Sequence, residues 1–172
     1  MNTPRDPTLL STWIRRIDKV GRRPPSAALR AELYEALDSK WEGVAVHAAR
    51  ALCRWGDRAS VARVRHALAT LAERPGREGP VSAIAEALIP CLSEDDLDWI
   101  IEVLFIRAHR DNRWSLRVLL SSVPGEVAID LVKQVGADPR VERAQLAWTL
   151  RVLGDSQRRV RALLDQLVGA QG

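Results

Sequence analysis

Apolar residues along this chain recur at intervals of three and four, which is the spacing of one face of an α-helix. In residues 8–20, for example, leucine, tryptophan, isoleucine and valine side chains form one such stripe. Ten segments of this kind follow one another, at residues 8–20, 26–37, 41–55, 58–73, 81–92, 94–110, 112–122, 127–135, 139–153 and 160–167. No segment shows the strict alternation of apolar and polar residues that marks a half-buried strand. The pattern therefore predicts an all-α fold of about ten short helices.

Turn and capping residues separate these predicted helices. Ser26 precedes the second helix as an N-cap candidate, and Gly56-Asp57 follows the third helix. Pro75-Gly76 marks the clearest loop. Ser93 with Asp96 three residues later resembles a capping box at the start of the sixth helix. That helix is apolar around much of its girth, so we expect it to lie centrally in the fold.

Two segments of the chain can be laid over each other. Residues 46–57 and residues 144–155 both end in Gly-Asp, and in both cases a second apolar helical stripe follows. Weaker copies lie between them, and the helix ends at Trp55, Leu92, Val123 and Leu153 are 37, 31 and 30 residues apart. A period in this range is typical of stacked helical hairpins, each of which cannot bury its apolar face alone.

The second copy carries a longer motif, namely Asp138-Pro139-Arg140-Val141 followed by Ala144, Ala147, Leu150, Leu153 and Gly154-Asp155. This motif resembles the short bacterial HEAT-like repeat, also found in phycobilin lyases, whose pattern is Asp-Pro-x-Val-Arg, spaced Ala and Leu, then Leu-Gly-Asp. Here Glu142 separates Val141 from Arg143, and Trp41 stands where the first copy would have Asp-Pro. The resemblance implies an α-solenoid of about five stacked antiparallel hairpins with one concave surface. We expect a single domain over 1–172, with a capping hairpin at 1–40, repeats at 41–168 and a frayed tail at 169–172.

Composition excludes several classes of protein and indicates a cellular compartment. The 172 residues are 47% hydrophobic with a net charge of +4, a balance that excludes general disorder. No apolar run approaches the roughly 20 residues of a membrane span, and the first residues lack the apolar core of a signal peptide. Two cysteines, Cys53 and Cys91, make no disulfide framework, so we expect a cytoplasmic protein. They lie 38 residues apart on separate predicted helices, where we expect them to act as small buried apolar side chains.

Charge is unevenly distributed. The net charge is +7 over residues 1–77, −7 over residues 78–102 and +4 over residues 103–172, and 23 of the 26 basic residues are arginine. One interpretation is ordinary: GC-rich codon usage places arginine on solvated faces, and acidic residues favour helix starts. The other interpretation is a binding groove, because arginine presents a planar fork to carboxylates and phosphates.

The spacing of the basic residues supports the groove. They recur at i, i+3 and i+7, or two turns apart, on odd-numbered predicted helices, which the repeat assigns to the concave side. Two tryptophans on the same helices could anchor a partner. The predicted binding residues are His47, Arg50, Arg54, Arg113, Trp114, Arg117, Arg143, Trp148 and Arg151.

No catalytic constellation is specific enough to predict an enzyme. The three histidines have no zinc-ligand spacing, no glycine-rich phosphate loop follows a strand, and no residue points to a bilin, so we expect neither metal nor cofactor. Asp111-Asn112-Arg113-Trp114 is similar to the opening of one inner helix in HEAT-like alkylpurine DNA glycosylases. The ordinary alternative is that Asp111 is an N-cap and that Trp114 packs in the core. We also expect Trp13, Trp55, Trp99 and Trp148 to pack between helices and Trp41 to be exposed.

The favoured hypothesis is a non-catalytic protein–protein interaction module or scaffold. Its concave arginine-lined face would bind a protein partner of acidic or mixed charge. The alternative is a nucleic-acid-binding protein related to the alkylpurine glycosylases. Because the acidic segment 78–102 would cross the middle of the groove, a mixed-charge partner fits better than a continuous phosphate track.

Overall fold

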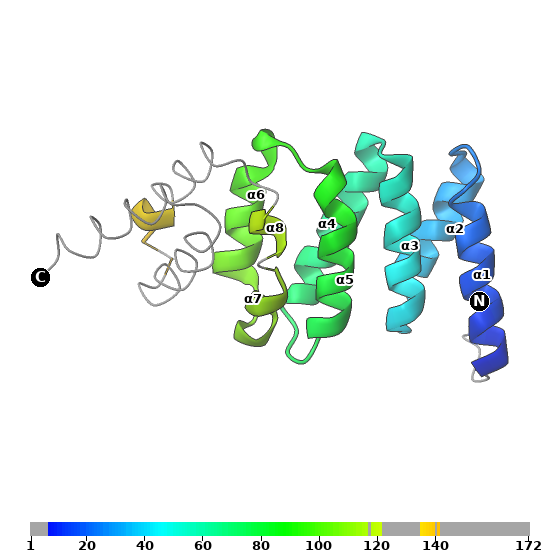
Figure 1. Ribbon diagram of the computed structural model, residues 1–172, viewed down its shortest axis with the longest axis horizontal. Helices are drawn as coiled ribbons and strands as arrows, with labels where there is room; N and C mark the ends of the chain where they lie inside the picture. The colour runs from blue at the N-terminus through cyan, green and yellow to red at the C-terminus, as the bar shows by residue number, and fades with distance from the viewer. Residues whose placement is uncertain (1–6, 117, 122–134, 140, 142–172) are drawn as a thin grey trace, which may run out of the picture.

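The computed structural model describes residues 7–116, 118–121, 135–139 and 141 (Figure 1). The elements are α1 (Pro7–Val20), α2 (Ala27–Leu37), α3 (Glu42–Trp55), α4 (Arg58–Ala72), α5 (Glu78–Leu88), η1 (Ile89–Cys91), η2 (Glu94–Asp96), α6 (Leu97–Ile101), η3 (Glu102–Arg107), α7 (Arg110–Leu116) and α8 (Val118–Ser121). The described residues contain no strand, and the predicted all-α class is confirmed. Beyond residue 121 only residues 135–139 and 141 are described, so most of the three helices predicted there and all of the second copy of the repeat lie outside the described residues.

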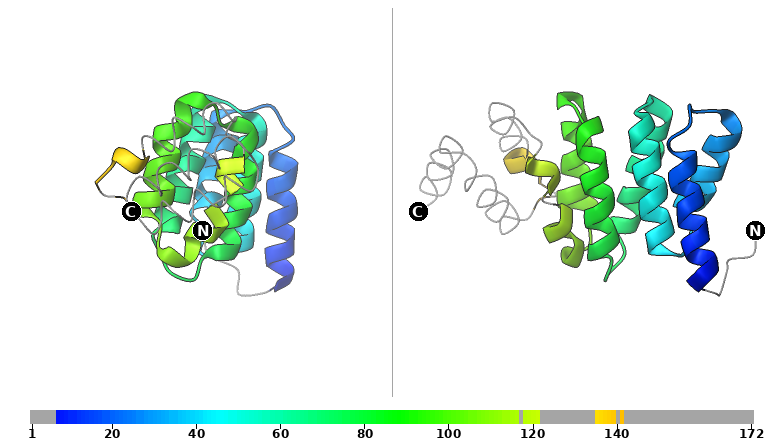
Figure 2. Two further views of the ribbon diagram at one scale, coloured as in Figure 1. Left: turned by 60° about the vertical axis from the view of Figure 1, so that its left-hand side comes forward. Right: turned by 45° about the vertical axis from the view of Figure 1, so that its right-hand side comes forward.

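The helices pack in two layers. One layer is α1, α3, α5 and α7, each in contact with the next, and the other is α2, α4 and η3. Contacts of α2 with α3, and of α4 with both α3 and α5, join the layers. Figures 1 and 2 show the helices standing side by side along one axis, from α1 at one end to α6, α7 and α8 at the other. Neighbours in the sequence are therefore neighbours in space.

Local capping accounts for the helix ends in the first half. The Ser26 side chain accepts a hydrogen bond from the backbone N–H of Leu29 at 3.3 Å, as its N-cap assignment predicted. Gly56 ends α3 in the left-handed region at φ 67°, which a side chain at this position would disfavour. Asp57 then caps α4 through the N–H of Ser60 at 3.0 Å. The Gly-Asp pair is thus a complete helix stop and start.

The fifth and sixth helices differ from the prediction. The fifth begins at Glu78 and leaves the α-helical path at Leu88, because Pro90 lies in the 3₁₀ turn η1. The single helix predicted for 94–110 is instead the 3₁₀ turn η2, the short helix α6 and the π-helical turn η3. A bond from the N–H of Ala108 to the carbonyl of Val103 at 2.9 Å closes the wider π turn. Only half of the capping box forms: the Asp96 carboxylate accepts from the Ser93 N–H at 2.8 Å.

The core runs continuously between the layers. Its largest fully buried side chains are Ile17, Leu33, Leu52, Leu68, Ile84, Leu88, Ile100, Leu104, Leu116 and Leu119. The central position expected for the sixth helix is confirmed by the burial of Val103, Leu104 and Phe105. At the end of α1, a Cβ on Gly21 would lie 2.5 Å from the Cβ of Ala51, so the two segments meet at backbone distance. No helix in the described part of the chain has the length and apolarity needed to cross a bilayer.

One tryptophan prediction was wrong, and for a second tryptophan the structure decides between two alternatives. Trp41 was expected to be exposed, but it is half-buried against the core, and its indole N–H is sealed from solvent. Trp114 was considered for the core, but 58% of its surface is exposed. Trp13, Trp55 and Trp99 pack against the core as predicted. Trp148 lies outside the described residues.

Arginines join successive helix pairs through carboxylates and tryptophans. Arg30 of α2 donates to Asp57 at 2.6 Å and lies over Trp55, with the guanidinium carbon 5.8 Å from the ring centre. The same combination recurs one pair further on, where Arg65 of α4 pairs with Asp96 and lies 4.5 Å from the ring centre of Trp99. Planar guanidinium groups suit both partners. Part of the arginine excess is therefore structural.

The link between Arg30 and Asp57 changes the pKa of Asp57. Burial favours the protonated form of Asp57, but hydrogen bonds from Ser60 and Arg30 outweigh that effect and lower its pKa from 3.8 to about 2. The Ser60 hydroxyl donates at 2.7 Å, and Ser60 is fully buried. Ionised Asp57 thus helps to hold α2 against the start of α4.

Candidate functional site

The predicted binding residues of α3 share one side of that helix but differ in their surroundings. His47 is half-buried, and its Nδ1 lies 2.9 Å from a carboxylate oxygen of Asp18 on α1, which makes it a link between these helices. Arg50 and Arg54 are exposed. They line a shallow hollow with Gly56 and with residues at the end of α5 and in η1.

The other predicted residues lie elsewhere. Arg113 and Trp114 are on α7; Arg113 donates from Nε to the Ala108 carbonyl at 3.2 Å, and Trp114 is exposed. The hollow beside Arg50 and Arg54 is built by α3, the α3–α4 turn, α5 and η1, without a contribution from α7. Four predicted residues lie outside the described residues: Arg117, Arg143, Trp148 and Arg151.

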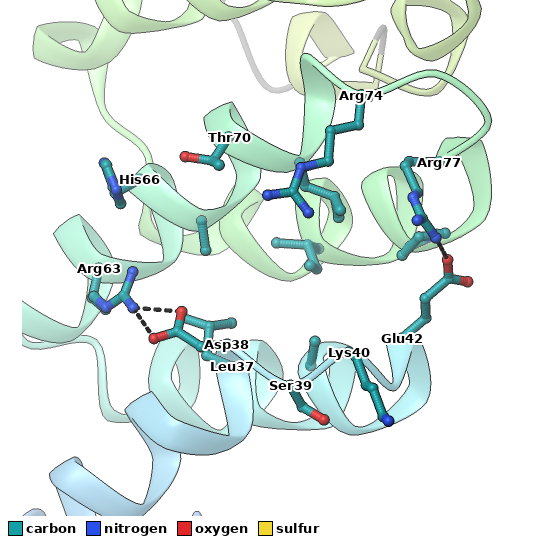
Figure 3. Close-up of a pocket in the computed structure, with 15 residues that line it drawn as sticks. Leu37, Asp38, Ser39, Lys40, Glu42, Arg63, His66, Thr70, Arg74 and Arg77 are labelled. Atoms are coloured by element: carbon teal, nitrogen blue, oxygen red, sulfur yellow. Dashed lines mark hydrogen bonds and ion pairs between the residues drawn. The ribbon is translucent and has the colours of Figure 1, made fainter. Parts of the chain in front are cut away.

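A second, more enclosed cavity lies along α4, and we call it the α4 groove (Figure 3). It has a volume of about 410 Å³ and runs between the α2–α3 connection, one face of α4 and the start of α5. Its lining residues are Leu37, Asp38, Ser39, Lys40, Glu42, Ala45, Arg63, His66, Ala67, Thr70, Leu71, Arg74, Arg77, Pro80 and Ile84. None of these was predicted as a site residue.

The floor of the α4 groove is apolar. Leu37, Ala45 and Ile84 are buried beneath it, and Ala67 and Leu71 of α4 are half-buried along its side. Their fixed positions in the core give the groove a preformed shape. A concave apolar floor with a few polar groups around it is the usual form of a binding site.

Two ion pairs lie at opposite ends of the groove. Arg63 of α4 donates from Nη2 to both carboxylate oxygens of Asp38, each at 2.5 Å. Arg77 at the start of α5 pairs with Glu42 at the start of α3. Figure 3 shows the two pairs on opposite sides of the space. Each pair cancels its own charge, so neither guanidinium is fully available to an incoming anion.

Three further cationic or ionisable side chains line the groove, and none has a carboxylate partner among the described residues: Lys40, His66 and Arg74. Figure 3 shows the Arg74 guanidinium extending into the space between the two ion pairs. The Lys40 ammonium lies 5.8 Å from the ring centre of Trp41 at the edge of the groove. Thr70 and His66 lie on the same face of α4. The groove therefore has a positive centre with mixed charge at its ends.

A buried amide from another helix holds the turn that carries Arg74 and Arg77. Asn112 of α7 is fully buried, and its Nδ2 donates to the carbonyls of Ala72 at 2.7 Å and Arg74 at 2.6 Å. Its Oδ1 accepts from the N–H of Arg77 at 3.2 Å. In the sequence, Asn112 stood out only as part of the glycosylase-like segment. Its hydrogen-bond partners are 35 to 40 residues away, so no local sequence pattern predicts them. Asn112 positions the groove without lining it.

The glycosylase-like segment takes a different form from the predicted one. Helix α7 begins at Arg110, so Asp111 lies in its first turn and is not the N-cap. The Asp111 carboxylate lies 3.2 Å from Nδ1 of His109 and 3.6 Å from Nε of Arg110. Among the described residues, no group of three or more His, Cys, Asp or Glu side chains is placed to hold a metal ion.

Comparisons with known proteins give no family for this chain. No protein-family model, no curated protein and no solved structure matches it.

Proposed function

We propose that this protein is a non-catalytic interaction module, an α-solenoid of the HEAT-like kind, that binds an acidic segment of a partner protein in the α4 groove. The two-layer order of α1 to α7 supports the solenoid, since each helix pair packs on the next. The observation that carries the function is the Arg74 guanidinium, unpaired among the described residues and directed into a preformed apolar groove.

The chemistry of the groove favours a carboxylate with an apolar neighbour. Arg74 can donate two parallel hydrogen bonds to a carboxylate, and Thr70 adds a hydroxyl on the same face. The apolar floor formed by Leu37 and Ile84 can receive an aliphatic side chain of the same segment. An extended peptide that alternates acidic and apolar residues meets both requirements.

The ends of the groove favour a protein over a nucleic acid. Asp38 and Glu42 bring carboxylates into its lining, and these would repel a continuous run of phosphates. The same carboxylates can accept hydrogen bonds from polar or basic residues at either end of a mixed-charge peptide. The pattern of charge thus selects against a uniform polyanion.

Binding of a fluorescein-labelled peptide that alternates glutamate and leucine, followed by fluorescence anisotropy, tests the proposal. Arg74→Glu should weaken binding about tenfold or more, because it replaces a charge-assisted contact by repulsion. Arg22→Glu makes the same charge change in the α1–α2 turn, outside the groove, and should alter binding less than about twofold.

Two further arms separate this surface and ligand from the alternatives. If Arg50→Glu weakens the peptide and Arg74→Glu does not, the binding face is the side of α3 predicted from the sequence. If a labelled DNA duplex binds more tightly than the peptide, with a steep loss of affinity in salt, the protein binds nucleic acid. Either result would overturn the proposal.

A further inference from the structure

Two cysteines that are distant in the sequence meet at the shallow hollow beside α3. Cys53 is buried in the last turn of α3, and Cys91 is the half-buried last residue of η1. The Cys91 thiol lies 3.3 Å from the carbonyl oxygen of Cys53, to which it donates. Cys53 lies in the core and Cys91 packs against it, as expected of small apolar side chains, and the fold brings the two residues together.

The surroundings of this pair are cationic. The hollow is lined by Arg50, Arg54, Gly56, Ala87 and Pro90 together with both cysteines. Arg50 and Arg54 are exposed and have no carboxylate partner among the described residues. The hollow is thus lined by two cationic side chains, which favour the approach of a negatively charged reagent.

The two thiols differ in access. Cys91 is the more exposed, which makes it the entry point for a reagent from solvent. Burial, together with the neighbouring Cys91 thiol, raises the pKa of the Cys53 thiol to about 12. Since the thiolate is the nucleophile, Cys53 is protected from direct reaction at neutral pH.

We propose that Cys53 and Cys91 form a redox-active dithiol site for small anionic disulfides of the glutathione class. Arg50 and Arg54 would hold the carboxylates of the disulfide beside the thiol of Cys91. The site is separate from the α4 groove, and its test is independent of the proposed function.

The reaction balances in two exchange steps. The Cys91 thiolate attacks one sulfur of glutathione disulfide; a Cys91–glutathione bond forms, the disulfide bond of the reagent breaks, and one glutathione leaves and takes up a proton. In this mixed disulfide the Cys91 thiol that helped to raise the pKa of Cys53 is gone. Cys53 loses its proton to solvent and attacks the sulfur of Cys91; a Cys53–Cys91 bond forms, the Cys91–glutathione bond breaks, and the second glutathione leaves and takes up a proton. Two protein thiols are oxidised to one disulfide, and one glutathione disulfide is reduced to two thiols.

The product would link two parts of the fold. A Cys53–Cys91 disulfide joins the end of α3 to the turn after α5 and closes a loop that contains all of α4. Because such a link restricts the unfolded chain, it should raise the melting temperature of the protein by several degrees.

The test begins with the reduced full-length chain, titrated with glutathione disulfide and followed by thiol alkylation and intact mass. The wild type should lose two hydrogens and retain no glutathione. Cys53→Ser should stop with one glutathione on Cys91, and Cys91→Ser should react far more slowly than the wild type. A wild type that stays reduced, or that accumulates glutathione without forming the internal disulfide, would refute the proposal.

The role of the arginines is tested by comparing glutathione disulfide with the neutral 2-hydroxyethyl disulfide. The double variant Arg50→Ala/Arg54→Ala should lower the ratio of the two rates about tenfold, while Arg22→Ala/Arg58→Ala should leave it unchanged. In wild-type protein the ratio should also fall at high salt, which gives a readout that needs no variant. An unchanged ratio in both experiments would show that the site does not select anions.

Discussion

The two turns that flank α4 have the same backbone feature but are supported in different ways. Each contains a glycine in the left-handed region, Gly56 at φ 67° and Gly76 at φ 66°. The α3–α4 turn is complete in itself, since Gly56 ends one helix and Asp57 caps the next. The α4–α5 turn has no side-chain cap at Arg77, and Asn112 of α7 supplies its hydrogen bonds.

This difference bears on function. In the α3–α4 turn, the hydrogen bonds that end α3 and begin α4 all join residues at most four positions apart. The turn held by Asn112 takes its shape only when α7 is packed beside it, and it carries Arg74 and Arg77 into the α4 groove. A site built on the second kind of turn depends on the packing of distant helices.

The largest effect should come from removing the remote support. Asn112→Leu should destabilise the protein by about 2 kcal/mol, because it leaves the Arg74 carbonyl and the Arg77 N–H without their partner and removes one of the two hydrogen bonds to the Ala72 carbonyl. Urea unfolding measures the loss, and the labelled acidic peptide should bind at least about fivefold more weakly to the variant that remains folded. A variant that keeps both stability and affinity would show that the turn does not need Asn112.

The self-contained turn should respond to pH. Asp57→Asn keeps a good N-cap but removes the charge that pairs with Arg30. Since the pKa of Asp57 is lowered to about 2, its ionised form stabilises the fold above pH 3.8 and that contribution is lost as the pH falls towards 2. Allowing for its partial exposure, the wild type should exceed Asp57→Asn in unfolding free energy by about 1–2 kcal/mol at pH 6.

The measurement is denaturant unfolding of both proteins at several pH values. The difference between them should shrink below pH 4 and be largely lost by pH 2. A constant difference over this range would mean that the charge of Asp57 does not stabilise the turn.

The smallest loss of stability is expected from replacing the left-handed glycine that each turn contains. Gly56→Ala and Gly76→Ala should each cost about 1 kcal/mol, because alanine disfavours a positive φ. An added Cβ meets nothing closer than 3.8 Å at Gly56 and nothing within 4 Å at Gly76, so no clash adds to either cost. Thermal unfolding should show similar decreases in melting temperature for the two variants. Unequal decreases would mean that the two glycines contribute differently to the stability of their turns.

The sequence predicted the features that depend on near neighbours. Helical spacing identified α1 to α4 closely, and Ser26, Gly56 and Asp57 marked their ends, because capping involves residues at most a few positions apart. The break of the sixth helix at η3 was missed, since an unbroken apolar pattern does not distinguish an α-helix from a π turn.

The α4 groove could not be predicted in the same way. Its ion pairs join residues 25 and 35 positions apart, and no spacing rule connects them. Helical spacing predicted Arg50 and Arg54, which are exposed on α3, as binding residues. The same spacing does not apply to Arg74, because Arg74 lies in a loop. The meeting of Cys53 with Cys91 was hidden for the same reason, since it needs α5 to pack on α3.

The arginine links described between α2 and α4, and between α4 and η2, have a mechanical consequence. Each joins only neighbouring helix pairs, so tension along the molecule would load the Arg30–Asp57 and Arg65–Asp96 links in series. Ion pairs act over a few ångströms and re-form without a change of fold. Because one apolar core also joins these helix pairs, a pulling force should break the two ion pairs only together with the packing around them.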